Sequence, residues 1–302
     1  MNTRFVEQAR LMLRVMPQVA KEDCFALKGG TAINFFLRDM PRLSVDIDLT
    51  YLPIEPREES LRGISQALAR IKIATGKAIP GVKVREHWLA GFISKLIVRG
   101  DECEVKIEPN LVMRGALEPP VRRTLSKNAV VKFGMSLSAR TLSDGEIFGG
   151  KICAALDRQH PRDLFDVKSL LDNEGITPSI RKAFVVCLVS HDRPMHELFD
   201  PPRKDVRALF ESQLEEMTAE SVTYEELTEA RERLIARLRT DLTDPEKKFL
   251  ISVKECHPDW SLMDQPGIEK LPAIQWKLQN IQKMDKAKYR DQLLALKNKL
   301  GL

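Results

Sequence analysis

LKGGTAINFFLRDMPRLSVDIDLTYL, residues 27–52, joins a Gly-Gly-Thr turn to a run in which polar and apolar residues alternate. In a strand, successive side chains point to opposite faces. A strand over Leu43–Tyr51 would therefore carry a polar face and an apolar core face. The polar face would hold Arg42, Ser44, Asp46 and Asp48, and the core face Leu43, Val45, Ile47 and Leu49. Two carboxylates about 7 Å apart on one face repel each other, and a divalent metal is the simplest ion to hold them.

Composition bounds the class of protein. A chain of 302 residues with 43% hydrophobic and 30% charged residues is expected to form a soluble globular protein with two subdomains. The chain contains no run of 18 apolar residues, so no membrane span is expected, and the N-terminus has no signal-peptide core. The five cysteines are scattered without a CxxC pair, which favours reduced thiols and a cytoplasmic location.

The positive charge is concentrated in the first part of the chain. Residues 1–170 contain 27 Lys and Arg against 20 Asp and Glu, a net +7, whereas residues 171–302 contain 21 against 23, a net −2. A basic surface around acidic metal ligands suits a polyanion such as a nucleotide or RNA. A mildly basic domain without such a partner fits the same count.

Hydrophobic periodicity and turn residues predict an α+β chain. The first half is expected to hold helices at 3–20, 32–38 and 58–72, with Thr31 capping the second. Strands are expected at 25–27, 43–51, 82–89, 91–99 and 103–110. From residue 146 onward the pattern is helical, at 146–158, 162–173, 178–190, 203–217, 223–240, 244–255 and 272–298. We therefore expect a mixed-sheet core over residues 1–140 and a mainly helical domain over 141–302.

Three features indicate phosphoryl chemistry. A Gly-Gly-Thr turn at a helix start offers backbone N–H groups and a hydroxyl to an anion. The Asp46-x-Asp48 strand follows it, and Glu108 lies on the polar side of a later strand. Carboxylates from two neighbouring strands beside an anion-binding turn suit two-metal nucleotidyl transfer, in which one metal holds a triphosphate and the other lowers the pKa of an attacking hydroxyl. The alternative is a strand face that is acidic by chance.

GGTAINFFLRDMPRLSVDIDL resembles the nucleotidyltransferases of the AbiEii/AbiGii toxin family, relatives of the MenT toxins in the DNA polymerase β-like superfamily. Further segments match in order along most of the chain: EVKIEPN (104–110), EIFGGKICAALDR (146–158), PRDLFDV (161–167) and LPAIQWKLQNIQKM (271–284). They resemble the third-carboxylate strand, the acidic-x4-Lys helix, the Arg-Asp-x-x-Asp motif and the C-terminal helix of that family. The chain departs from the wider superfamily at Thr31, where Ser is usual, and at Glu108, where Asp is common.

The resemblance implies a polymerase β-like nucleotidyltransferase fold and a set of site residues. Asp46 and Asp48 would be catalytic ligands of Mg²⁺ or Mn²⁺, with Glu108 as a third metal ligand. The nucleotide would be bound by the turn and the polar face, through Gly29, Gly30, Thr31 and Ser44.

The helical domain would complete the active site with Lys151 and Asp163. By resemblance, Lys151 would neutralise triphosphate charge, Asp163 would be the last catalytic acid, and Arg162 would contact phosphate. From spacing alone, a helix lysine such as Lys151 is usually just a solvated charge. Arg162 and Asp163 could likewise be part of a helix-capping cluster.

The implied function is that of a toxin in a bacterial toxin–antitoxin or phage-defence (abortive infection) system. It would transfer a nucleoside monophosphate from an NTP to an acceptor hydroxyl, with the tRNA 3′ end as the leading acceptor, and so block translation. A cognate antitoxin would be its partner. Two alternatives stay open at this point: modification of a protein hydroxyl, as in AMPylation, and a non-catalytic module that binds nucleotide or partner.

Overall fold

The computed structural model describes residues 1–302, which form two compact units. The first comprises Met1–Ser143 with Glu211–Ser221, and the second comprises Asp144–Phe210 with Val222–Leu302. The chain thus passes from the first unit to the second three residues after the predicted boundary at 140/141. The segment Glu211–Ser221, predicted as part of the helical domain, belongs to the first unit. None of the helices is both long and apolar enough to cross a membrane.

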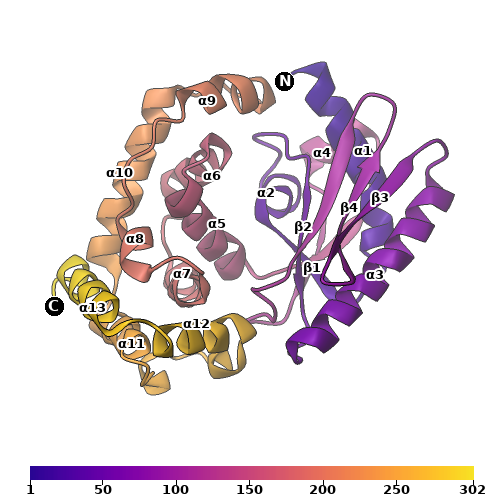
Figure 1. Ribbon diagram of the computed structural model, residues 1–302. Helices are drawn as coiled ribbons and strands as arrows, with labels where there is room; N and C mark the ends of the chain where they lie inside the picture. The colour runs from indigo at the N-terminus through magenta and orange to yellow at the C-terminus, as the bar shows by residue number, and fades with distance from the viewer. The chain divides into compact units, whose positions relative to one another are not determined.

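A seven-stranded mixed sheet forms the centre of the first unit (Figure 1). The strand order is β3-β4-β5-β2-β1-β7-β6, in which the pairs β1–β7 and β2–β5 are parallel and the others antiparallel. The α+β class and the mixed sheet are as predicted. The strands are β1 (Phe25–Lys28), β2 (Ile47–Tyr51), β3 (Lys83–Leu89), β4 (Phe92–Arg99), β5 (Glu104–Asn110), β6 (Val121–Thr124) and β7 (Ser138–Thr141).

Helices α1 (Thr3–Val19) and α3 (Arg57–Ala78) contact each other and the strands of this sheet. In β2, Ile47, Leu49 and Tyr51 point to one face, and all three are buried. Tyr51 lies against Gly63 of α3, where an added Cβ would be 2.2 Å from the tyrosine oxygen. The apolar face predicted from the alternation is therefore the face that α3 covers. The polar face is the opposite one.

The strand predicted at 43–51 is shorter than expected, because β2 begins only at Ile47. Arg42 instead forms an isolated bridge with Thr218, and the Leu43 N–H donates to the Met217 carbonyl at 2.8 Å. Residues 41–43 thus pair with residues 217–219 after α9, and residues 44–46 lie outside the sheet. Leu43 and Val45 are nevertheless buried, as the alternation predicted.

The helix predicted at 32–38 also differs from expectation. It begins earlier, as α2 (Gly29–Ala32), and continues as a π-helical turn, η1 (Ile33–Leu37), closed by a 2.8 Å bond from the Arg38 N–H to the Ile33 carbonyl. The pattern did not predict β6, α4 (Lys127–Phe133) or α8 (Met195–Phe199), which are each four to seven residues long.

The second unit is built from helices, as predicted. Helix α5 packs closely on α7 because Gly149 has no side chain. A Cβ added at Gly149 would lie 2.7 Å from the Phe184 nitrogen. The predicted helix at 272–298 is two helices, since Asp285 caps a second one. The helices are α5 (Asp144–Arg158), α6 (Pro161–Asp172), α7 (Pro178–Ser190), α8, α9 (Arg207–Gln213, shared with the first unit), α10 (Tyr224–Asp241), α11 (Asp244–Lys254), α12 (Pro272–Gln282) and α13 (Lys286–Leu300).

Candidate active site

Three charged residues lie side by side across the polar face of the sheet. Lys28 at the end of β1 is in register with Asp48 of β2, and Asp48 is in register with Glu108 of β5. Register partners on neighbouring strands point to the same face, with the strands about 4.8 Å apart. Asp48 therefore stands between a lysine and a second carboxylate, and the predicted neighbours Asp48 and Glu108 are adjacent in the structure.

Lys95 of β4 extends this row. Its Nζ lies 2.9 Å from Glu108 Oε1, and both side chains are about one-third exposed, at 34% and 36%. Sequence reasoning named neither Lys95 nor Lys28. The position of Lys95 could have been inferred from the sequence. The short turn between β4 and β5 sets a register that pairs Leu96 with Ile107, and this register brings Lys95 beside Glu108.

Gly29 allows the Asp48 carboxylate to lie directly against the start of α2. Its φ of +70° is one that side chains with a Cβ rarely adopt, and an added Cβ would lie 2.5 Å from Asp48 Oδ2. Glycine is thus required here both for backbone conformation and for the close approach. The Gly-Gly turn and the Asp-x-Asp segment therefore approach each other closely at Gly29.

Gly29→Ala is accordingly expected to displace the Asp48 carboxylate. We expect nucleotidyl transfer to fall by about 100-fold, since misplaced catalytic groups cost about that much, and stability to fall by about 1–3 kcal/mol from the unfavourable φ. Steady-state kinetics and urea unfolding measure the two effects. Gly76→Ala on α3 is the matched control, because a Cβ there meets nothing within 4 Å; near-wild-type kinetics for Gly29→Ala would contradict the proposed contact.

Thr31 and Ser44 form a buried hydroxyl pair beneath Asp46. The Thr31 hydroxyl donates to the Asp46 carbonyl at 2.6 Å, and its oxygen lies 3.0 Å from Ser44 Oγ. Thr31 is fully buried and Ser44 is 6% exposed. The prediction that Thr31 caps this helix is wrong, because α2 begins two residues before it, at Gly29. These hydroxyls hold the backbone that carries Asp46, and their contact with a nucleotide stays a prediction.

Arg42 and Gly30 pack under the same turn. Arg42 is only 2% exposed, and its Nη1 donates to the Leu43 carbonyl at 2.7 Å. An added Cβ on Gly30 would lie 2.9 Å from Arg42 Nη2 and 2.9 Å from Ser44 Oγ. Gly30 therefore leaves room for a buried guanidinium close to the turn.

The residues around the turn fit a hard divalent cation. Asp46 and Asp48 are both partly exposed and offer only carboxylate oxygens, the donors that Mg²⁺ and Mn²⁺ prefer. No group of three His, Cys, Asp or Glu side chains is arranged to hold a metal by itself. Mg²⁺ is commonly bound by one or two carboxylates together with substrate phosphates and water, so two aspartates suffice. Metal binding by Glu108, which is paired with Lys95, stays a prediction.

A second charged cluster lies in the helical unit, between α5 and α6. Lys151 Nζ is 2.7 Å from Asp163 Oδ1 and 3.0 Å from Asp166 Oδ2. All three side chains are at most 5% exposed. Lys151 is therefore a buried, doubly paired lysine and not the solvated charge that its spacing alone suggested.

Arg158 completes this cluster by binding Asp163 with two nitrogens, Nε at 2.5 Å and Nη2 at 3.0 Å. The connection between the helices sets this geometry, because His160 caps α6 by accepting the Arg162 N–H at 3.2 Å. Burial by itself would raise the pKa of Asp163, but the charges and hydrogen bonds of Lys151 and Arg158 outweigh it and hold the pKa well below its usual range.

The depressed pKa of Asp163 predicts a loss of stability in acid. A carboxyl whose pKa is lowered by folding stabilises the protein above its unfolded pKa, near 3.8, and this contribution is lost as pH falls towards the folded value. We expect the free energy of unfolding to drop below about pH 4, measured by urea titration from pH 6 to 2. Asp163→Asn should flatten this part of the profile; an unchanged slope in that variant would contradict the assignment.

Comparison with known proteins now defines the family. The sequence profile described as "Nucleotidyl transferase AbiEii toxin, Type IV TA system" matches residues 10–280, most of the chain. The chain belongs to the AbiEii family of nucleotidyltransferase toxins. AbiEii proteins are enzymes of type IV toxin–antitoxin systems, so an NTP substrate and a cognate antitoxin go with this membership. The resemblance drawn from the sequence motifs is confirmed.

A solved structure shares the AbiEii fold seen here. It is MenT4, a nucleotidyltransferase toxin from Mycobacterium tuberculosis H37Rv, with a TM-score of 0.57 and 18% sequence identity over 97% of this chain and 91% of that chain. At this identity the likeness establishes the fold. The search of curated protein sequences found no match.

Proposed function

We propose that this AbiEii protein is a Mg²⁺-dependent enzyme that transfers a nucleoside monophosphate from an NTP to the 3′ hydroxyl of tRNA. The observation that carries this is the close approach of Asp48 to Gly29 within the charged row of Lys28, Asp48 and Glu108. An anion-binding turn and a metal-binding carboxylate in direct contact can hold a metal–triphosphate complex.

The proposed reaction forms one bond and breaks one. The acceptor oxygen attacks the α-phosphorus, the bond between the α-phosphorus and its bridging oxygen to the β-phosphorus breaks, and pyrophosphate leaves. A bound Mg²⁺ would be held by Asp46 and Asp48, and it supplies charge neutralisation and a lowered pKa for the attacking hydroxyl. Gly29 and Gly30 let the backbone approach the phosphates.

Lys28 and Lys95 are additional positive groups on the same face. Each stands next to a carboxylate, Lys28 by Asp48 and Lys95 by Glu108. In the absence of triphosphate they offset the repulsion between the two acids. We propose that the Lys95–Glu108 pair keeps Glu108 aligned beside Asp48, where it can serve as the third metal ligand.

We further propose that residues 141–302 contribute Lys151 and Asp163 to the same reaction. The support is the buried cluster, because a lysine fixed by Asp163 and Asp166 is a pre-oriented charge of the kind that phosphoryl transfer uses. Arg162, next to Asp163 at the start of α6, is the proposed phosphate contact of this part.

An RNA acceptor is supported by charge. The net charge of +7 over residues 1–170 is carried by the part that holds the row and the turn. A basic surface attracts a polyanionic acceptor and speeds its encounter. A protein hydroxyl as acceptor would gain nothing from this surplus, so we treat protein labelling as an outcome of the test.

The test uses NTPs labelled at the α-phosphate, Mg²⁺ and total tRNA. We expect label to enter tRNA, and to be lost when the tRNA 3′ diol is first oxidised by periodate. The same NTPs labelled at the γ-phosphate should leave no label on RNA, since pyrophosphate departs. Label on protein with none on tRNA would replace tRNA by a protein acceptor, and no transfer with any NTP would contradict enzymatic activity on either class.

A further inference from the structure

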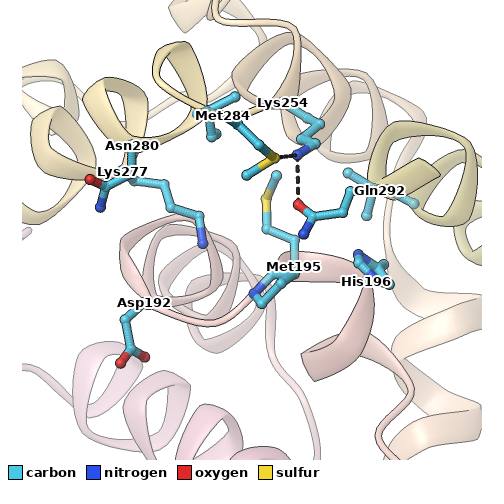
Figure 2. A pocket seen from close by; sticks show the side chains of 11 residues that line it. Asp192, Met195, His196, Lys254, Lys277, Asn280, Met284 and Gln292 are labelled. Atoms are coloured by element: carbon cyan, nitrogen blue, oxygen red, sulfur yellow. Dashed lines mark hydrogen bonds between the residues drawn. The ribbon is translucent and has the colours of Figure 1, made fainter. Parts of the chain in front are cut away.

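A cavity in the helical unit is lined by two buried lysines that play no part in the proposed reaction. Its volume is about 60 Å³, several times the roughly 10–15 Å³ that one water requires. Figure 2 shows its lining side chains, with Lys254 and Lys277 directed towards the space between the helices. The lining comes from the α7–α8 and α12–α13 connections and from α8, α11, α12 and α13.

Lys277 of α12 is only 6% exposed. Its Nζ donates to two backbone carbonyls in the α7–α8 connection, those of His191 at 2.7 Å and Arg193 at 2.6 Å. It forms no ion pair with a carboxylate. Burial, with a smaller effect from Lys254, lowers the pKa of Lys277 to about 8, which leaves the ammonium mostly charged at neutral pH.

Lys254 at the end of α11 is similarly enclosed, at 4% exposure. Its Nζ donates to Gln292 Oε1 at 2.8 Å and lies 3.6 Å from Met284 Sδ, the two contacts drawn in Figure 2. The Tyr289 ring centroid is 5.3 Å away. Lys254 also has no carboxylate partner, and burial lowers its pKa.

The same unit shows how a buried lysine is normally neutralised. Lys151 has two aspartates within 3.0 Å, whereas Lys254 and Lys277 have only neutral partners. A buried charge without a counter-ion costs free energy that neutral hydrogen bonds offset only in part. Two such charges around one cavity create a strong positive potential, and an anion in the cavity would neutralise it.

The remaining charged and titratable groups offset that potential only in part: the Asp192 and Glu197 carboxylates favour the charged form of Lys277, but burial outweighs them. His196 also lines the cavity, and burial lowers its pKa, so it is a neutral donor or acceptor at pH 7. Asp192 is the acidic lining residue; its side chain is 70% exposed at the rim and accepts the Arg193 N–H at 2.9 Å. Near His196, Glu197 is held by Arg193 at 3.1 Å, and Lys299 by Asp200.

We propose that this cavity is an anion site that binds a phosphate group through the ammonium groups of Lys254 and Lys277. The Gln292 amide and His196 would complete the hydrogen bonds to the phosphate oxygens. The methionine and aliphatic walls exclude water, which strengthens the ionic contacts. The phosphate comes either from a small free ligand or from an RNA backbone, and both present the same anionic oxygens to the site.

The first test measures thermal stabilisation of full-length Asp48→Asn protein by inorganic phosphate at constant ionic strength. The Asp48→Asn background removes turnover. We expect a saturable rise in Tm with phosphate but not with chloride, and at least a tenfold weaker apparent affinity in Lys254→Met and in Lys277→Met. Lys283→Met at the exposed end of α12 is the matched control and should bind like the parent. Saturable stabilisation that survives both cavity substitutions would overturn the proposal, as would its absence in the parent.

Loss of binding in these variants can be separated from unfolding. Replacing a buried, unpaired lysine by an apolar residue of similar length is often neutral or stabilising, so both Met variants should melt no lower than the parent without phosphate. If either variant melts lower, Gln292→Leu provides a second test, since it removes a neutral lining group. It should weaken phosphate binding several-fold, and unchanged binding there would count against the site.

Proton uptake provides an independent readout. At pH 8, near the pKa of Lys277, a bound anion favours the charged lysine, so binding should take up protons from solution. Calorimetry in two buffers of different ionisation enthalpy should show this uptake for the parent and not for Lys277→Met. Binding without a difference between these two proteins would contradict a role for Lys277.

Competition identifies the source of the phosphate. An RNA oligonucleotide with a blocked 3′ end, and separately a nucleoside monophosphate, are titrated against protein held at half-saturation with phosphate. Displacement by RNA alone assigns the site to a backbone phosphate, and displacement by the monophosphate assigns it to a small ligand. Displacement by neither would overturn a site for organic phosphates. The transfer assay with Lys254→Met reports on the proposed function separately.

Discussion

Asp48→Asn is expected to lower nucleotidyl transfer by about 10³-fold or more. The substitution keeps the shape of the side chain and removes the charge that would bind the metal and that stands between Lys28 and Glu108. Asp48 is partly exposed, on the polar side of a strand whose other side is buried, so the fold should survive. The measurement is kcat/KM with α-labelled NTP, alongside circular dichroism and urea unfolding.

A matched control separates this effect from a general loss of negative charge. Asp101→Asn, in the exposed β4–β5 turn, changes the net charge equally and should keep wild-type transfer. In cells, expression of the wild type should slow growth and Asp46→Ala should relieve it, because Asp46 is the second proposed metal ligand. If Asp48→Asn retains more than about a tenth of the activity, the charged row is not the catalytic centre.

Lys151→Ala is expected to cost about 3–5 kcal/mol of folding stability. The change removes the ammonium that contacts Asp163 and Asp166 and leaves two buried carboxylates, of which Asp163 keeps Arg158. Breaking a buried ion pair from one side is far more costly than removing a surface pair. Urea unfolding of the full chain at pH 7 measures the loss.

The comparison is Lys182→Ala on α7. Lys182 pairs at 3.1 Å with Asp264, whose side chain is 97% exposed, and such a pair contributes about 0–1 kcal/mol. A loss of less than about 1 kcal/mol for Lys151→Ala would mean that the two aspartates are solvated or protonated. Kinetic effects of substituting Lys151 are therefore interpretable only at temperatures where the variant is folded.

The pattern in residues 43–51 predicted the two faces of β2 because alternation depends on backbone geometry alone. The apolar residues are buried, and Asp48 lies beside Glu108 on the other face. The class of the chain and most of its helices follow from the same local periodicities. In the charged row, only the Lys95–Glu108 contact follows from a short connection, the β4–β5 turn. Long segments join β1, β2 and β5, so the tertiary structure sets the register of Lys28, Asp48 and Glu108.

Features that depend on distant packing were not predictable. The strand predicted from residue 43 begins only at Ile47, and Arg42 and Leu43 pair instead with Thr218 and Met217, far along the chain. Likewise, Lys151 and Lys277 are buried, although lysines on helices are usually solvated. Only the tertiary structure reveals that the first has two aspartate partners and the second has none.

The most direct test of the central claim is to locate the metal. The claim is that Asp46 and Asp48 hold the divalent cation beside the Gly29–Gly30 turn. With Fe²⁺ replacing Mg²⁺ and a non-hydrolysable NTP analogue present, hydroxyl radicals formed at the metal should cut the backbone near residues 28–31, 46–48 and 108. Asp48→Asn should abolish these cuts. Cleavage that persists in that variant, or that falls only elsewhere in the chain, would contradict the account.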